Sequence, residues 1–391
     1  MPVVVLVVAA LYAASAHAAW RPLPERGRGA PWILALAVGE TAPLQLVAGA
    51  VVVAGAAAAG WAGGVLGTAS LGLFAVGGVL HAITHARAMQ ARRVLGAAVH
   101  EAAGGRVRWS RMRVRDQLRP WAPYPGHIRR RVVSYGPHPS HRAVMLEADE
   151  RAGPSPVFCY VHGGGWTSGS PGRQGRPLLR HLAERGWLVF DVGYRLSPEA
   201  TYPDHLHDVQ RAIAWVRGTA RDHRADSRFV AVGGGSAGGH LAAMAALTGE
   251  SCEHGDGRVQ ACVPIYGVHD LLDGAGPKWP YLATHVLKVG VETDRDAWLA
   301  ASPVHAATAR RPPFLVVHGA FDSLVRPDES RRLVAALRSA GGPPVGHAEL
   351  PGATHGFDSV ASVRGIRTAQ AIASALETLY EEHVARSDGA S

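Results

Sequence analysis

The sequence predicts an α/β domain, with a mostly parallel sheet covered by helices on both faces, that follows a set of transmembrane helices. Residues 41–85 contain no Asp, Glu, Lys or Arg over 45 positions, more than twice the roughly 20 residues that one spanning helix needs. After residue 132, short apolar runs alternate with amphipathic stretches, which is typical of the strands and helices of a parallel sheet.

The apolar amino-terminal region divides into three candidate spans. Gly60-Trp-Ala-Gly-Gly64 is a glycine-rich turn that separates a span at 41–59 from one at 64–84. A third candidate covers Pro2–Ala19, and its Ala16-His17-Ala18 also resembles a signal-peptidase site. A cleaved signal normally begins with a basic segment, and this one does not. We therefore favour three uncleaved helices, while a cleaved signal followed by two spans stays open.

The net charge of +9 is concentrated in one segment. Residues 87–131 contain 12 arginines against two acids, Glu101 and Asp116, whereas residues 132–391 are close to neutral. A basic segment beside membrane helices is attracted to anionic headgroups, so we expect membrane lipids and no nucleic acid as partners. Short cytoplasmic loops are enriched in Lys and Arg, which predicts a multi-pass membrane protein with a cytoplasmic catalytic domain. By the same rule, the arginines after the first span, Arg21, Arg26 and Arg28, predict that this loop is also cytoplasmic.

The carboxy-terminal part alternates predicted strands and helices. The predicted strands are Ile128–Tyr135, Ala143–Ala148, Pro156–Val161, Trp187–Val192, Arg228–Val232, Val259–Ile265, Phe314–His318 and Val345–Leu350. The predicted helices are Pro177–Arg185, Asp204–Arg217, Ala237–Leu247, Pro327–Ala340 and Arg364–Val384. Alternating basic and apolar residues predict one more, half-exposed strand at Arg111–Arg115. Because sites in such sheets gather at the carboxyl ends of the strands, motifs at those ends are the candidates for chemistry.

The sequence Gly234-Gly235-Ser236-Ala237-Gly238-Gly239 directly follows a predicted buried strand and opens a helix. G-x-S-x-G in this setting is a nucleophile elbow, a tight turn that lifts the serine hydroxyl clear of the backbone. The helix amino terminus behind it favours developing negative charge. A phosphate-binding loop would need a following Lys, which this motif lacks. Ser236 is therefore the predicted nucleophile.

A serine nucleophile needs a base, and the base needs an orienting acid. His355 follows the last predicted strand and Asp322 follows the strand before it. This gives the chain order Ser, Asp, His that serine hydrolases built on such a sheet use. Asp328 competes with Asp322, but a carboxylate in the first turn of a helix suits the helix dipole. We therefore predict Asp322 and His355 as the other two catalytic residues.

A second glycine-rich motif, His162-Gly-Gly-Gly165-Trp166, follows another buried strand. Its unobstructed N–H groups at Gly164 and Gly165, with the N–H of Ala237, are predicted to form an oxyanion hole. His162 itself is expected to shape the loop. The three cysteines, Cys159, Cys252 and Cys262, have spacings that fit no zinc site. The predicted serine chemistry implies no metal or organic cofactor.

Residues 155–385 resemble the hormone-sensitive-lipase-like esterases, the HGGG family of the α/β-hydrolase superfamily. The motifs that carry the resemblance are His162–Trp166, Tyr194–Glu199, Gly234–Gly239, His318–Asp322 and His355–Phe357. The resemblance implies an α/β-hydrolase fold and serine esterase activity. It also implies a lid over the acyl pocket, formed partly by an insertion near residues 268–312. Gly235 departs from the family, which usually has Asp before the nucleophile.

The predicted organisation is a membrane region at 1–86, a basic juxtamembrane and lid-proximal segment at 87–131, and a catalytic domain at 132–391. The predicted function is a membrane-anchored carboxylesterase or lipase-like enzyme that acts on a small-molecule, lipid-derived ester. A formamidase or prenylcysteine methylesterase of the same fold is one alternative. A catalytically inactive membrane binding module is another. These patterns leave the acyl chain length and the oligomeric state open.

Overall fold

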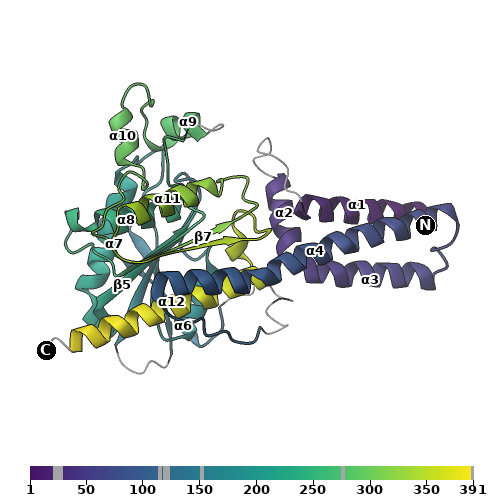
Figure 1. Ribbon diagram of the computed structural model, residues 1–391, viewed down its shortest axis with the longest axis horizontal. Coiled ribbons are helices and arrows are strands. Elements are labelled where there is room, and N and C mark those ends of the chain that lie inside the picture. The colour runs from purple at the N-terminus through teal and green to yellow at the C-terminus, as the bar shows by residue number, and fades with distance from the viewer. Residues whose placement is uncertain (21–29, 113–116, 118–123, 150–153, 274–277, 389–391) are drawn as a thin grey trace.

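The structure is a computed structural model that describes residues 1–20, 30–112, 117, 124–149, 154–273 and 278–388. It has two parts, an α/β domain and a projection of apolar helices that extends from it (Figure 1). The long helix α4 (Gly64–Ala103) belongs to both parts.

The α/β domain is built on one eight-stranded sheet with the order β1-β2-β4-β3-β5-β6-β7-β8. β2 runs antiparallel to β1 and β4, and the remaining pairs are parallel. The strands are β1 (Ile128–Ser134), β2 (Arg142–Ala148), β3 (Ser155–Val161), β4 (Leu188–Val192), β5 (Ala225–Gly235), β6 (Ala261–Ile265), β7 (Phe314–Gly319) and β8 (Val345–Leu350). Every strand predicted from residue 128 onward is present.

Helices cover both faces of this sheet, as the alternation predicted. Along β3, Val157 and Cys159 face one buried core while Phe158 and Tyr160 face the other, the period of two expected for a strand. The first core is completed by α7 (Asp204–Gly218), α8 (Ala237–Thr248) and α11 (Asp328–Ser339). The second is completed by α6 (Arg176–Glu184), α12 (Val363–Asp388) and the second half of α4.

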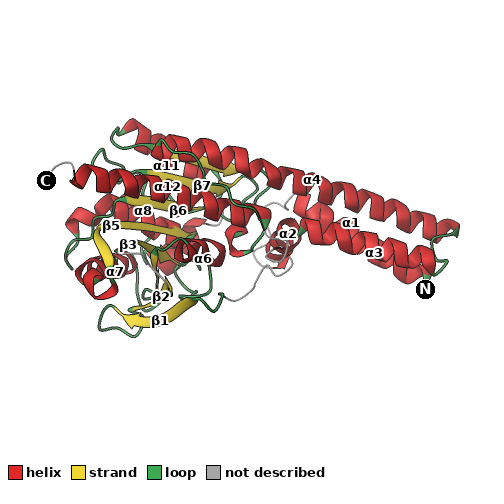
Figure 2. Ribbon diagram, turned by 90° about the horizontal axis from the view of Figure 1, so that it is seen from below, coloured by secondary structure: helices red, strands yellow, loops and turns green. Residues whose placement is uncertain are grey.

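Helix α4 is continuous across residue 86, where the sequence suggested a boundary between the membrane region and the basic segment. Its second half lies along the α/β domain beside α12 and β8 (Figures 1 and 2). Within that half one face is apolar and buried, while Arg92 and Arg93 point to solvent. The buried residues recur every three or four positions, the spacing of one helix face, at Ala91, Leu95, Ala98 and Ala102. The start of the basic segment is thus part of an amphipathic helix of the domain.

No strand forms over residues 105–112. The strand predicted at Arg111–Arg115 is therefore wrong for its first two residues, and the other three lie outside the described residues. The N–H of Arg108 donates to the Ser374 side chain of α12 at 2.9 Å instead of to a strand. The guanidinium groups of Arg92 and Arg367 lie 5.4 and 5.3 Å from the ring centroid of Trp109. Arg108 and Trp109 thus contact α4 and α12 and do not pair with the sheet.

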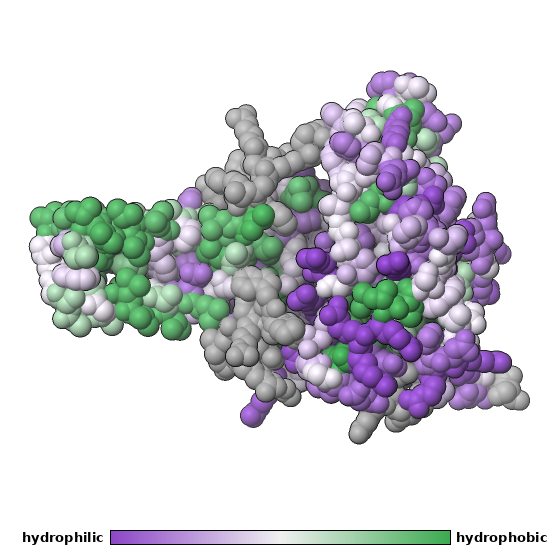
Figure 3. Space-filling view, turned by 180° about the vertical axis from the view of Figure 1, so that it is seen from behind, coloured by the Kyte–Doolittle hydropathy of each residue, from purple (hydrophilic) through white to green (hydrophobic). Residues whose placement is uncertain are grey.

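The projection contains α1 (Pro2–Trp20), α2 (Ala30–Glu40), α3 (Ala42–Ala58) and the first half of α4. Its surface is largely hydrophobic (Figure 3). Among the described residues, α1 and α4 are each long and apolar enough to cross a membrane. The pair α2 and α3, bent by 78° near Thr41, would count as a third span if taken as one. The arginines that follow the first predicted span lie outside the described residues.

Candidate active site

Ser236 lies in a tight turn between β5 and α8. Its backbone adopts φ 58° and ψ −123°, a conformation that a residue with a side chain keeps only when its surroundings impose it. Gly234 and Gly238 let this turn approach β3, because a Cβ on either would lie within 2.4 Å of the Val161 carbonyl oxygen. The glycines of the motif therefore make room for a strained turn that holds the half-buried serine at the amino terminus of α8.

The glycine-rich loop after β3 lies against Ser236. A Cβ on Gly163 would be 3.0 Å from the Cβ of Ser236, and Gly164 and Gly165 have φ angles of 123° and 61°. The N–H of Gly163 donates to Gln174 at 2.7 Å. Among the described residues, none accepts a hydrogen bond from the N–H of Gly164 or Gly165. Free N–H groups beside a serine are what an oxyanion hole requires.

His162 shapes this loop, as the sequence predicted. Its Nδ1 lies 2.8 Å from the Gly163 carbonyl oxygen, and its ring stacks on Tyr194 with 4.5 Å between centroids. The Tyr194 hydroxyl in turn donates to the His162 carbonyl oxygen at 3.1 Å. Burial lowers the pKa of His162 to about 4, so the imidazole is neutral at physiological pH and serves to fix the loop.

The structure brings His355 and Asp322 together at the ends of β8 and β7. His355 Nδ1 lies 2.6 Å from Asp322 Oδ2. The other carboxylate oxygen accepts the N–H groups of Leu324 and Val325, both at 2.9 Å. The competing carboxylate, Asp328, begins α11 and pairs with arginines at the surface instead. Of the two candidates, only Asp322 can hold the imidazole in one orientation.

A second histidine also contacts Asp322, and this contact was not predicted from the sequence. His318 Nε2 lies 3.4 Å from Asp322 Oδ2 inside the protein. Burial alone would raise the pKa of Asp322, but His355 and His318 beside it lower this pKa to about 2. The carboxylate is therefore ionised over the whole range in which a hydrolase would be assayed.

Tyr266 and Asp358 form a buried pair behind His355 that the sequence did not predict. The Tyr266 ring lies 4.6 Å from the His355 ring, and its hydroxyl donates to the Asp358 carboxylate. A Cβ on Gly235 would lie 2.9 Å from the Tyr266 hydroxyl. The absence of Asp at position 235 thus has a structural reason, because Tyr266 occupies that space. The position of Tyr266 directly after β6 was the one signal available in the sequence.

The insertion predicted as a lid contacts the glycine-rich loop through Tyr281, at the end of α9 (Lys278–Tyr281). The Tyr281 hydroxyl donates to the Gly165 carbonyl oxygen at 2.7 Å and lies 3.1 Å from the Thr167 hydroxyl. Trp298 of α10 (Arg295–Ala300) is fully buried, and its indole N–H donates to the Val289 carbonyl oxygen at 3.1 Å. In this insertion Trp298 serves core packing, whereas Tyr281 approaches the site.

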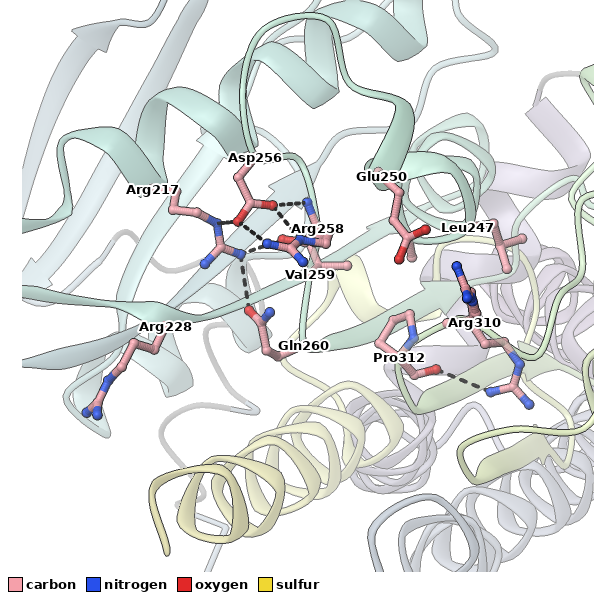
Figure 4. Close-up of a pocket in the computed structure, with 13 residues that line it drawn as sticks. Arg217, Arg228, Leu247, Glu250, Asp256, Arg258, Val259, Gln260, Arg310 and Pro312 are labelled. Atoms are coloured by element: carbon pink, nitrogen blue, oxygen red, sulfur yellow. Dashed lines mark hydrogen bonds and ion pairs between the residues drawn. The ribbon is translucent and has the colours of Figure 1, made fainter. Parts of the chain in front are cut away.

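A cavity of about 640 Å³ is present elsewhere in the domain, and none of the predicted catalytic residues lines it (Figure 4). Its charges are largely paired within the protein. Arg258 bonds Asp256 at 2.9 Å, and Arg217 bonds Gln260 at 3.2 Å. Arg311 donates to the carbonyl oxygens of Leu337, in the last turn of α11, and of Gly341, just after this helix, both at 3.0 Å. This cavity is separate from the candidate active site.

Comparisons with known proteins agree with the esterase resemblance that the motifs carry. The BD-FAE family model matches residues 145–337. The chain is 40% identical over 269 residues to the probable carboxylic ester hydrolase LipM of Mycobacterium tuberculosis, a match that covers 66% of this chain and 62% of LipM. It is 28% identical over 227 residues to the isoprenylcysteine alpha-carbonyl methylesterase of Arabidopsis thaliana, covering 54% and 53% of the two chains.

Among solved structures, the apo form of Thermogutta terrifontis esterase 2 superposes with a TM-score of 0.53 and 28% identity. This match covers 67% of the present chain and 96% of that esterase. The present chain spans less than two thirds of the length of LipM. The region matched by the family model, residues 145–337, contains Ser236 and Asp322. The carboxy-terminal domain of this chain is therefore an α/β-hydrolase domain, similar to those of bacterial esterases.

Proposed function

We propose that the protein is a membrane-anchored serine esterase with Ser236, His355 and Asp322 as its catalytic triad. One observation carries the proposal most directly. A serine in a strained strand-to-helix turn lies at the same sheet edge as a buried His355–Asp322 pair separated by 2.6 Å. The similarity to the ester hydrolase LipM supports the reaction class.

In the proposed reaction His355 takes the proton of the Ser236 hydroxyl as its oxygen attacks the ester carbonyl carbon. The N–H groups of Gly164, Gly165 and Ala237 stabilise the negative oxygen of the tetrahedral intermediate. When the intermediate collapses, the bond to the alcohol breaks and His355 protonates the leaving oxygen. Water then attacks the acyl-enzyme, with His355 again as base, and releases the acid and free Ser236.

Changing Gly164 to alanine is expected to lower kcat by about 100-fold, the usual loss for one oxyanion donor. The added Cβ would lie 2.1 Å from the Ser168 carbonyl oxygen, so the loop must move and carry the donor away. The matched control is Gly186→Ala, since Gly186 also has a positive φ but has open space around it. In steady-state kinetics, the Gly186→Ala variant should have a kcat close to that of the wild type. A Gly164 variant with wild-type kcat would exclude this loop from catalysis.

We further propose that the substrate is a lipid-derived ester that reaches the site from the bilayer. The hydrophobic projection supports this, because it would keep the domain beside the membrane (Figure 3). The arginines that flank the predicted spans favour the cytoplasmic face. Hydrolysis of p-nitrophenyl esters with two to sixteen acyl carbons, by detergent-purified protein, is expected to peak at the longer chains. A peak at the shortest chains would contradict a lipid substrate while leaving the esterase intact.

Methyl ester hydrolysis on a prenylated cysteine is a second candidate function. The similarity to the Arabidopsis thaliana methylesterase favours it, although the match covers only 53% of that protein. Release of methanol from a prenylcysteine methyl ester, compared with hydrolysis of an acyl ester of similar hydrophobicity, separates the two. The enzyme proposed first should prefer the acyl ester, and a clear preference for the prenylcysteine substrate would replace it.

A further inference from the structure

Glu40 is a buried carboxylate at the end of α2, where the apolar projection meets the α/β-hydrolase domain. Its Oε1 lies 2.9 Å from Nη1 of Arg364, and its Oε2 accepts the Ser362 hydroxyl at 2.7 Å. The side chains of Glu40 and Arg364 are only 2% and 0% exposed. An ion pair removed from water in this way is held by its geometry, and loss of one member leaves a buried charge without compensation.

Arg364 contacts two further parts of the chain through the same guanidinium group. Its Nε donates to the carbonyl oxygen of Pro351 at 3.1 Å, directly after β8. Its Nη2 donates to the carbonyl oxygen of Thr84 in α4 at 3.3 Å. Pro351 and Ser362 are the two ends of the loop that contains His355. Both ends of this loop are thus tied to helices of the projection by one buried cluster.

The loop that carries Asp322 is held from the same side. Arg87 of α4 donates to the Trp20 carbonyl oxygen at the end of α1, at 3.1 Å. Its guanidinium group also lies 5.1 Å from the ring centroid of Phe321, the residue before Asp322. Figure 1 shows the matching arrangement, in which β7 ends on the side of the domain nearest α2. The loops of the base and the acid therefore both abut the apolar helices.

We propose that Glu40 and Arg364 are positioning residues, through which the apolar helices hold the His355 loop in register with Ser236. This inference rests on the proposed esterase function for its catalytic consequence. The helices are then more than an anchor. Because the cluster joins α2 and α4 to the loop, a change in how these helices pack, such as their transfer between lipid environments, would alter the rate of the chemical step.

The test compares Glu40→Gln with Glu101→Gln in the full-length protein in detergent. Glu101 also joins α4 to the domain, through an ion pair with Arg338 at 3.0 Å, but that pair is exposed. Three quantities are measured for each variant: kcat and KM on a short, water-soluble ester, and the rate of hydrogen exchange in peptides that cover residues 351–362. A displaced His355 should lower kcat by about 10- to 100-fold with little change in KM. The backbone amides of this loop should exchange faster than in the wild type in Glu40→Gln, and at the wild-type rate in Glu101→Gln.

Glu40→Asp keeps the test decisive if the Gln variant does not fold, because it retains the charge and shortens only the reach. Glu40→Asp should show a smaller decrease in kcat and a smaller increase in exchange across residues 351–362, while the amides of α8 exchange at the wild-type rate. A folded Glu40 variant with wild-type kcat, or with wild-type exchange across 351–362, would overturn the proposal. If the wild-type protein hydrolysed no ester, the proposed function would fail, while the exchange result would still decide whether Glu40 holds the loop.

Discussion

Replacing Ser236 by alanine is expected to lower kcat for ester hydrolysis by about 10⁴- to 10⁶-fold, the loss typical of removing a serine nucleophile. The oxyanion donors would remain, so a small residual rate above the uncatalysed reaction should persist. Ser236 also makes a backbone bond, from its N–H to the Ile265 carbonyl oxygen at 3.0 Å. Since alanine preserves that bond and removes only the hydroxyl, the variant should fold.

The measurement is steady-state hydrolysis of the best p-nitrophenyl ester, beside thermal unfolding to confirm the fold. Ser134→Ala is a suitable control, because Ser134 is an exposed serine on the edge strand β1. It should keep wild-type kinetics. Retention of more than about a thousandth of wild-type kcat by the Ser236 variant would mean that another group attacks the ester.

Replacing Asp322 by asparagine should lower kcat by about 10⁴-fold, close to the loss seen when the acid of a serine triad is made neutral. Asparagine fits the same space but presents a neutral amide to His355 Nδ1, which favours the wrong tautomer of the imidazole. Asp328→Asn is the matched control, six residues away and paired only with surface arginines. A wild-type rate for the Asp322 variant, or an equal loss for the Asp328 variant, would contradict the assignment.

The lowered pKa of Asp322 predicts how the effect of this substitution on stability depends on pH. The pKa is about 2 in the folded protein and about 3.9 in an unfolded chain. Ionised Asp322 therefore stabilises the fold above pH 4, and this contribution is lost as the pH falls through 2. The loss of unfolding free energy in the asparagine variant should accordingly not diminish between pH 9 and pH 5. A loss that disappeared at pH 5 would mean that Asp322 is protonated there.

Much of the α/β-hydrolase domain could be predicted because the apolar runs of single strands agree with the strand–helix alternation of the whole domain. Each buried strand is a short apolar run, and the motifs with chemistry follow β3, β5, β7 and β8 at their carboxyl ends. Ser236, Asp322 and His355 could each be chosen on that ground, and the contact between the last two is observed at 2.6 Å. Pattern alone also separated Asp322 from Asp328, because a helix start explains the second carboxylate.

The contacts that were missed join residues far apart in the chain. In the sequence, Glu40 only precedes the uncharged segment 41–85, yet in the structure it pairs with Arg364, 324 positions away. Tyr266 and Asp358 are 92 positions apart, and neither belongs to a motif. The second half of α4 was missed for a different reason. Its arginines dominate the composition, while its buried face is made largely of alanines that give a weak hydrophobic signal.

The most direct test of the central claim is to label the purified protein with a fluorophosphonate and locate the adduct by mass spectrometry. Such a probe reacts with a serine only when a base and an oxyanion hole activate it. We predict a single adduct on Ser236, absent from the Ser236→Ala variant and strongly reduced in Asp322→Asn. An adduct on another residue, or no adduct on a folded protein, would contradict the assignment of Ser236 as an activated nucleophile.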